Sequence, residues 1–165
     1  MAQNTPQIII HPIEPTYDAH SRILILGSFP SVKSREMMYF YGHPQNRFWK
    51  IVSALYNEET PMTVEERRSF LLRNHIAAWD SIHQCTISGS SDSSIRDVIP
   101  NDLSSILNTA NIEQIYCNGR KSWDMYHRYI EPLSGREAVC LPSSSPANAS
   151  WSLEKLIEAW SVIRN

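Results

Sequence analysis

The chain has 165 residues, of which 42% are hydrophobic and 19% are charged, and its formal net charge is −2. This length is typical of one domain, so we expect residues 1–165 to form a single unit with residues 1–20 as an extended N-terminal arm. A net charge so close to zero excludes a protein coated with positive charge, as nonspecific nucleic-acid binders usually are, but it leaves room for a local basic patch.

The elements predicted along the chain alternate between strands and helices. Residues 23–26 form a continuous apolar run that ends at Gly27, which is typical of a strand buried on both faces. Thr63 and Glu66 have the spacing of a capping box and predict a helix that runs to about Asn74. Further strands are predicted over 76–79, 112–117 and 138–141, and further helices over 46–56, 101–110, 123–130 and 153–163. This alternation predicts an α/β fold with a mainly parallel sheet.

Turn-forming and small polar residues gather where the predicted strands end. In an open parallel sheet, ligands bind beyond the carboxyl ends of the strands. Four segments should therefore meet there: 27–31, 80–81, 118–119 and 142–148. None of them offers a strong nucleophile beside a base, and the chain lacks the phosphate-loop, dinucleotide, nucleophile-elbow and zinc-protease motifs. We expect a site made of amides, hydroxyls, backbone N–H groups and an aromatic ring.

Cysteine and histidine usage argues against a disulfide framework or a metal site. The three cysteines are widely spaced without a C-x-x-C pair, and the six histidines lack metal-ligand spacing. No stretch approaches the length of a membrane span, and the N-terminus lacks a secretory pattern. We therefore expect a cytoplasmic monomer without metal or cofactor and without a membrane partner.

Five short segments follow one another in a distinctive order. They are Gly-Ser-Phe-Pro-Ser at 27–31, Tyr-Gly-His-Pro-Gln-Asn-Arg-Phe-Trp at 41–49, Ala-Trp-Asp at 78–80, Cys-Asn-Gly at 117–119 and Leu-Pro-Ser-Ser-Ser-Pro-Ala at 141–147. Together they resemble the uracil-DNA glycosylase superfamily and, within it, most of all the hypoxanthine-DNA (deoxyinosine) glycosylase family. The resemblance spans about residues 11–163.

The resemblance implies a three-layer α/β/α sandwich with a four-stranded, mainly parallel sheet. It also implies an enzyme that flips a deaminated base out of DNA and hydrolyses its N-glycosidic bond, which leaves an abasic site. The partner is then DNA that contains a deaminated base, and hypoxanthine is the expected base. A glycosylase that prefers uracil, or a noncatalytic protein that binds DNA lesions or nucleotides on the same fold, remains an alternative.

Two positions depart from the pattern of the wider superfamily. Phe29 stands where the first motif usually has Asn or Asp to hold the attacking water, and Ser143 stands where the second motif often has a histidine. In the hypoxanthine family, the resemblance assigns the water to the asparagine of the H-P-x-N segment, which is Asn46. These departures argue against efficient excision of uracil. A helix cap is the structural alternative for Asn46, since it precedes a predicted helix.

The remaining site residues fall into two groups. The resemblance places the base against Gly27, Ser28, Phe29 and Asn118, with the Phe29 ring stacked on it and the Asn118 carboxamide reading its edge. It places the DNA backbone against Ser31, Arg47, Ser143, Ser144 and Ser145. The structural alternatives are a core position for Phe29, a turn for Asn118 and a plain surface turn for the serines. Asp80 is left without a role.

Overall fold

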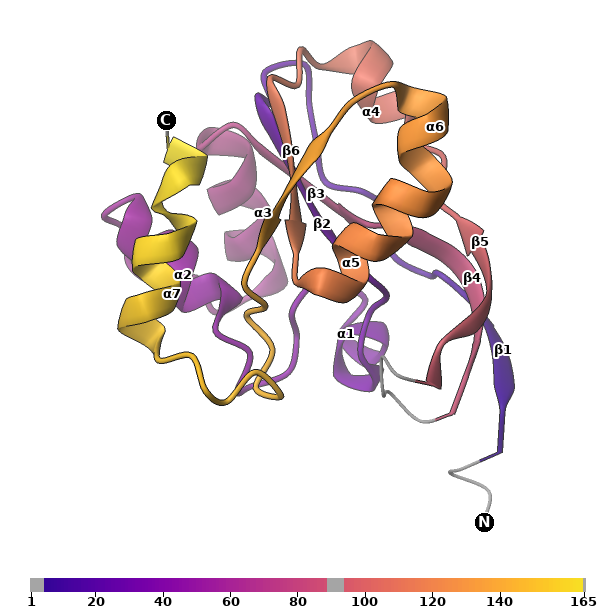
Figure 1. The fold of residues 1–165 in the computed structure, drawn as a ribbon. Coiled ribbons are helices and arrows are strands. Elements are labelled where there is room, and N and C mark those ends of the chain that lie inside the picture. The colour runs from indigo at the N-terminus through magenta and orange to yellow at the C-terminus, as the bar shows by residue number, and fades with distance from the viewer. Residues whose placement is uncertain (1–4, 89–93, 165) are drawn as a thin grey trace.

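The computed structural model describes residues 5–88 and 94–164. Its main sheet is parallel and has the strand order β3-β2-β6-β7. The strands are β2 (Ile23–Gly27), β3 (Ile76–Asp80), β6 (Gln114–Asn118) and β7 (Ala138–Leu141). Their carboxyl ends point to the same edge of the molecule, where helix α1 and the loop after β7 lie (Figure 1). The predicted four-stranded parallel sheet is confirmed.

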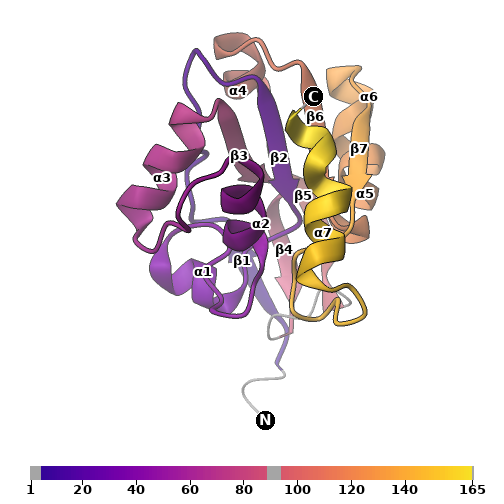
Figure 2. The same ribbon diagram turned by 90° about the vertical axis from the view of Figure 1, so that its left-hand side faces the viewer.

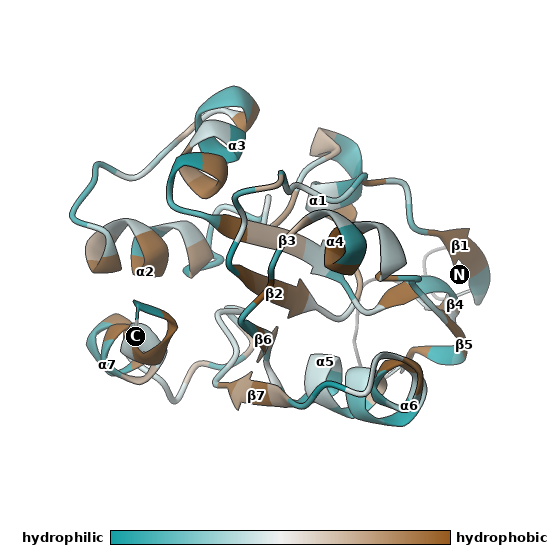
Figure 3. Ribbon diagram, turned by 90° about the horizontal axis from the view of Figure 1, so that it is seen from above, coloured by the Kyte–Doolittle hydropathy of each residue, from teal (hydrophilic) through white to brown (hydrophobic). Residues whose placement is uncertain are grey.

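Helices cover both faces of this sheet. On one face lie α2 (Phe48–Leu55), α3 (Val64–Arg73) and α7 (Leu153–Trp160), as Figure 2 and Figure 3 show. On the other lie α4 (Ser104–Thr109), α5 (Arg120–Met125), a π-helical turn (Tyr126–Ile130) and α6 (Glu131–Ser134). Side chains alternate along β2, so Ile25 packs into the first layer and Leu26 into the second. The three-layer α/β/α architecture is confirmed.

A second, antiparallel sheet was not indicated by the sequence pattern. It has the order β1-β4-β5 and consists of β1 (Gln7–Ile10), β4 (Ile82–Ile87) and β5 (Arg96–Pro100). Register shifts in the β4–β5 pairing interrupt the two-residue alternation that would identify such strands. Residues 89–93, between β4 and β5, lie outside the described residues.

Local capping explains where two of the helices begin. Thr63 and Glu66 form the predicted capping box at the start of α3. The six-residue helix α1 (Val32–Met37) was not predicted, and it begins because the Ser31 hydroxyl accepts a hydrogen bond from the Ser34 N–H. The chain closes with a 3-10 turn (Ser161–Arg164). No helix in the described part of the chain is long and apolar enough to span a membrane.

The burial of the cysteines predicts a simple modification pattern. Cys85 and Cys117 are buried, whereas Cys140 is exposed on β7. Burial also raises the pKa of the Cys117 thiol to about 12, so its reactive thiolate is scarce near neutral pH. We expect iodoacetamide to add one group to the native protein and three groups to the protein in urea, as measured by intact mass. Rapid modification at two or more sites of the native protein would contradict this burial.

Candidate functional site

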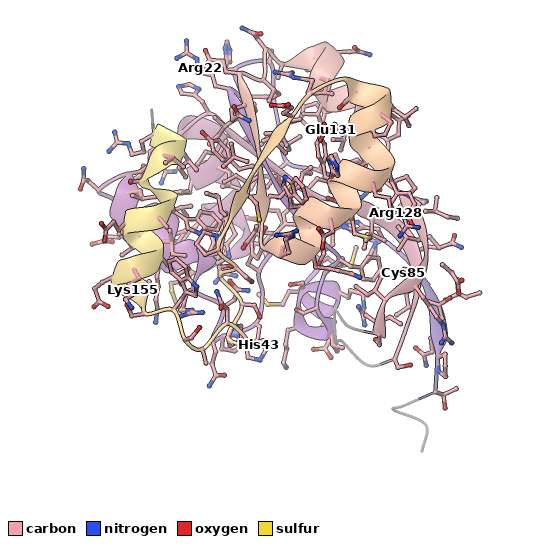
Figure 4. All side chains as sticks on the ribbon, in the orientation of Figure 1. Arg22, His43, Cys85, Arg128, Glu131 and Lys155 are labelled. Carbon is pink, nitrogen blue, oxygen red and sulfur yellow. The ribbon has the colours of Figure 1, made fainter. Side chains whose placement is uncertain are left out.

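A cavity of about 500 Å³ opens at the carboxyl ends of the parallel strands. Each of the four predicted segments contributes to its lining, and so does the segment between α1 and α2. Figure 4 labels His43, one of the lining residues, at this edge of the molecule. The lining residues are Gly27, Ser28, Phe29, Pro30, Ser31, Ser34, Phe40, Tyr41, His43, Asn46, Asp80, Asn118, Ser143, Ser144, Ser145, Pro146 and Ala147. The sequence therefore located the cavity.

Asn46 lies half-buried at the cavity, just before α2. Its Oδ1 accepts a hydrogen bond from the Phe48 N–H at 2.9 Å and another from the Ser144 hydroxyl at 2.8 Å. The first bond satisfies a backbone donor at the start of α2, although the N-cap position belongs to Arg47 and not to Asn46 as the structural alternative expected. The second bond connects Asn46 to the loop after β7. Asn46 thus supports the helix and lines the cavity at the same time.

Asn118 is held by Ser144 at the end of β6. Its Oδ1 accepts from the Ser144 N–H and its Nδ2 donates to the Ser144 hydroxyl, both at 2.9 Å. These two bonds take up the carboxamide oxygen and one of its two N–H groups. The geometry therefore shows that Asn118 holds the loop, and its contact with a base edge through the second N–H stays a prediction.

Of the three loop serines, Ser144 departs most from its predicted role. Ser144 is 0% exposed, which is incompatible with the expected contact to a DNA phosphate in this conformation. Ser143 and Ser145 are half-buried, and both line the cavity. The Ser143 hydroxyl accepts from the Ser145 N–H at 3.1 Å, which tightens the turn. The contact of Ser143 and Ser145 with DNA stays a prediction.

The Arg47 side chain binds the loop that follows β7. Its guanidinium donates to the carbonyl oxygens of Ser144, Ser145, Asn148 and Trp151, and its backbone N–H donates to the Ser144 carbonyl. These hydrogen bonds fix the segment after β7 relative to α2. Arg47 therefore holds the loop, and its expected contact with a DNA phosphate stays a prediction.

The segment after β2 combines packing with cavity lining. Phe29 is 8% exposed and belongs to the core of the second sheet, with the Arg35 guanidinium 5.7 Å from its ring centre. It lines the cavity as well, so both predicted roles of its ring remain compatible with the structure. Ser28 lines the cavity, and Ser31 lines it while capping α1. Base contacts of Ser28 and Phe29 and a DNA contact of Ser31 stay predictions.

Asp80 and His11 form a buried pair that the sequence did not connect. Nε2 of His11 lies 2.7 Å from Oδ2 of Asp80, and Asp80 is 4% exposed. The Ile13 N–H donates to Nδ1 of His11 at 3.2 Å. In the neutral ring this leaves the proton on Nε2, which then donates to Asp80. The other oxygen, Oδ1, accepts no hydrogen bond from the described residues, and Asp80 lines the cavity.

Gly27 is required for this arrangement. A Cβ at residue 27 would lie 2.3 Å from Oδ1 of Asp80 and 3.3 Å from the Tyr41 hydroxyl. A contact of 2.3 Å is impossible, so any larger residue would displace the carboxylate. Gly27 therefore contributes to the predicted base-binding region by making room for Asp80.

Tyr41 is a second cavity residue that sequence reasoning missed. Its backbone has φ of 52°, which is unusual for a bulky residue and is found where a site holds strain. Its ring stacks on Phe48 with the centroids 4.1 Å apart, and its hydroxyl is buried without a hydrogen-bond partner. Burial, and then the nearby Asp80 carboxylate, raise the pKa of Tyr41 far above its ordinary value. Asn118 lies beside this hydroxyl, outside hydrogen-bonding geometry.

The basic residues near the cavity are few. Lys33 and Lys50 are exposed, whereas the Arg35 guanidinium donates to the Pro30 carbonyl at 2.8 Å. Lys33 also lies 3.5 Å from Glu36. Among residues 5–88 and 94–164, no group of three or more His, Cys, Asp or Glu side chains could hold a metal ion. The cavity lining therefore combines neutral polar groups, aromatic rings and the Asp80 carboxylate.

Comparison with known proteins finds a matching family, similar sequences and a similar structure. The model of the uracil DNA glycosylase superfamily matches residues 14–164. A hypoxanthine DNA glycosylase of Methanosarcina acetivorans is 36% identical over 153 residues, which are 90% of this chain and 94% of the relative. One of Methanosarcina barkeri is 34% identical over 136 residues, which are 81% of this chain and 85% of the relative. A solution NMR structure from M. acetivorans, named as a candidate uracil DNA glycosylase, superposes with a TM-score of 0.78 at 31% identity, covering 96% of this chain and 100% of that one.

Proposed function

Because the chain belongs to the uracil DNA glycosylase superfamily, we propose that it is a DNA repair glycosylase that hydrolyses the N-glycosidic bond of hypoxanthine flipped out of DNA. Two relatives that match most of the chain carry the name hypoxanthine DNA glycosylase. The observation that carries the proposal is Asn46, held by two hydrogen bonds at the edge of a cavity large enough for a nucleoside.

Asn46 would act by positioning water. Cleavage of a glycosidic bond passes through an oxocarbenium-like state, so the attacking water need not be strongly activated. A carboxamide fixed at both its helix and its loop can hold that water beneath C1′ of the sugar. The water then bonds to C1′ as the bond to the base breaks, and the base leaves with the electron pair.

Asp80 is the group best placed to read the base. Hypoxanthine presents an N–H at N1, where adenine presents a bare nitrogen that can only accept a hydrogen bond. Oδ1 of Asp80 can accept that N–H, because His11 occupies the other oxygen. Adenine would place two acceptors against each other at the same point. Guanine, thymine and uracil share the N–H group, so the shape of the cavity must separate them.

A cleavage assay tests the proposed function. Duplexes that contain one deoxyinosine, deoxyxanthosine, deoxyuridine or deoxyadenosine are incubated with the protein, and abasic sites are then cut with alkali. We expect strand scission to be fastest for deoxyinosine and slowest for deoxyadenosine. Binding of the deoxyinosine duplex without scission of any substrate would instead support a noncatalytic lesion-binding protein.

A further inference from the structure

The orientation of both site carboxamides can be deduced from the donors around them. The Ser144 backbone N–H can only donate, so the Asn118 atom 2.9 Å from it is the oxygen. Nδ2 of Asn118 must then face the Ser144 hydroxyl, also at 2.9 Å. Ser144 Oγ accepts that bond, which leaves its own proton for Oδ1 of Asn46 at 2.8 Å.

A second donor identifies the same oxygen of Asn46. The Phe48 N–H lies 2.9 Å from Oδ1 and can only donate to it. The Phe48 N–H and the Ser144 hydroxyl, which come from different segments, therefore indicate the same orientation of the Asn46 carboxamide. A carbonyl oxygen has two lone pairs, and both are used here. The Nδ2 group of Asn46 donates to no described residue, so it is the polar group that Asn46 offers to the cavity.

We infer that Ser144 is a positioning residue that makes Asn46 present its NH₂ group, and not its carbonyl, to the attacking water. The NH₂ donates to one lone pair of the water oxygen, and the other lone pair forms the bond to C1′. The C1′–N bond breaks with its electron pair on the base, and the proton lost by the water neutralises the departing base. This inference rests on the proposed glycosylase function and specifies how its central residue works.

The location of Ser144 supports this role. It is 0% exposed, its backbone carbonyl accepts from the Arg47 N–H at 3.0 Å, and Arg47 also holds the rest of the loop. The hydroxyl is therefore shielded from solvent, and it donates its proton to Oδ1 of Asn46. The hydrogen bonds thus form a chain in which Asn118 donates to Ser144 and Ser144 donates to Asn46.

The first test replaces the hydroxyl. We expect Ser144→Ala to lower the single-turnover rate of hypoxanthine release by about 10- to 100-fold, as the loss of one buried hydrogen bond does. Affinity for DNA that contains a tetrahydrofuran abasic analogue should stay the same, and Ser144→Thr should restore part of the rate. The matched control is Ser53→Ala, which removes a buried hydroxyl that bonds to Lys50 and Thr60 away from the cavity. An unchanged rate for folded Ser144→Ala would overturn the inference.

The second test reverses the group that faces the water. Asn46→Asp keeps the size and keeps an oxygen for Phe48 and Ser144, but at pH 8 it replaces the NH₂ donor with a carboxylate oxygen. The inference requires this variant to be about as slow as Asn46→Ala. A rate equal to or above that of the wild type would show that Asn46 acts as an acceptor and would overturn the inference, even if Ser144→Ala does not fold.

A spectroscopic measurement separates this inference from the proposed function. In ¹⁵N–¹H spectra of the free protein, Ser144→Ala should shift the side-chain NH₂ signals of Asn46 and Asn118, and Ser53→Ala should shift neither. If the wild type releases no base from any duplex, the proposed function fails while these shifts still decide the orientation. If the wild type is active but the NH₂ signals do not move in Ser144→Ala, the inference alone fails.

Discussion

Replacing Asn46 with alanine is expected to lower the single-turnover rate of hypoxanthine release by about 10²–10⁴-fold, the range typical of one positioned catalytic group. The variant loses the only part of Asn46 that can hold water, while the cavity walls remain. Affinity for a deoxyinosine duplex should therefore change little. Rates are measured with enzyme in excess, so that product release does not hide the chemical step.

Stability must be measured alongside this rate. Asn46 also accepts from the Phe48 N–H at the start of α2, and loss of one such hydrogen bond typically costs about 1 kcal/mol. The melting temperature should fall slightly without loss of the fold. Asn108→Ala on the exposed side of α4 is the matched control and should leave the rate unchanged. If Asn46→Ala released hypoxanthine as fast as the wild type, another residue would have to hold the water.

The sheet could be predicted from the sequence because its strands obey a simple rule. All five residues of β2 are buried, and a strand covered on both faces must be apolar throughout. The start of α3 could be predicted for an equally local reason, since Thr63 and Glu66 bond each other's backbone. Both signals depend on residues that are neighbours in the chain.

The second sheet and the Asp80–His11 pair depend on contacts that local patterns do not encode. His11 and Asp80 are 69 residues apart in the chain, and β1 must pair with β4 before His11 can reach the cavity. Without that pairing, Asp80 reads as one more polar residue at a strand end. A histidine between prolines in the N-terminal arm likewise gives no sign of the carboxylate it will meet.

The role of Asn118 could not be predicted from the sequence for a different reason. An asparagine at the carboxyl end of a parallel strand is well placed either to bind a ligand or to hold a loop, and the sequence is the same in both cases. In the structure, the N–H and the hydroxyl of Ser144 bond to the oxygen and to one of the two N–H groups of this carboxamide, so Asn118 holds the loop. The sequence thus predicted which segments form the site, whereas the hydrogen bonds between them determine which residue does what.

Asp80→Asn is expected to change which base the protein accepts. In the variant, Nε2–H of His11 would still donate to the side-chain oxygen, so the new NH₂ would take the place of Oδ1 and face the cavity. The NH₂ group would face the N1–H of hypoxanthine as donor against donor, but it can donate a hydrogen bond to the bare N1 of adenine. A site can discriminate by about 10⁴-fold against a substrate that leaves its buried polar groups unpaired. Losing even part of this discrimination between hypoxanthine and adenine would therefore be a large effect.

We expect Asp80→Asn to lower kcat/KM for deoxyinosine by about 10²-fold or more and to lower the ratio of deoxyinosine to deoxyadenosine cleavage at least as much. Asp80→Ala serves as the matched control, because it removes the acceptor without adding a donor and should slow both substrates. Competition between the two duplexes in one tube measures the ratio directly. If the ratio of deoxyinosine to deoxyadenosine cleavage were unchanged in folded Asp80→Asn, another residue of the cavity would have to contact the base edge. A carboxylate that contacts N1 accepts a hydrogen bond there, whereas an amide NH₂ group donates one. The exchange must therefore change the preference between a base with N1–H and a base with a bare N1.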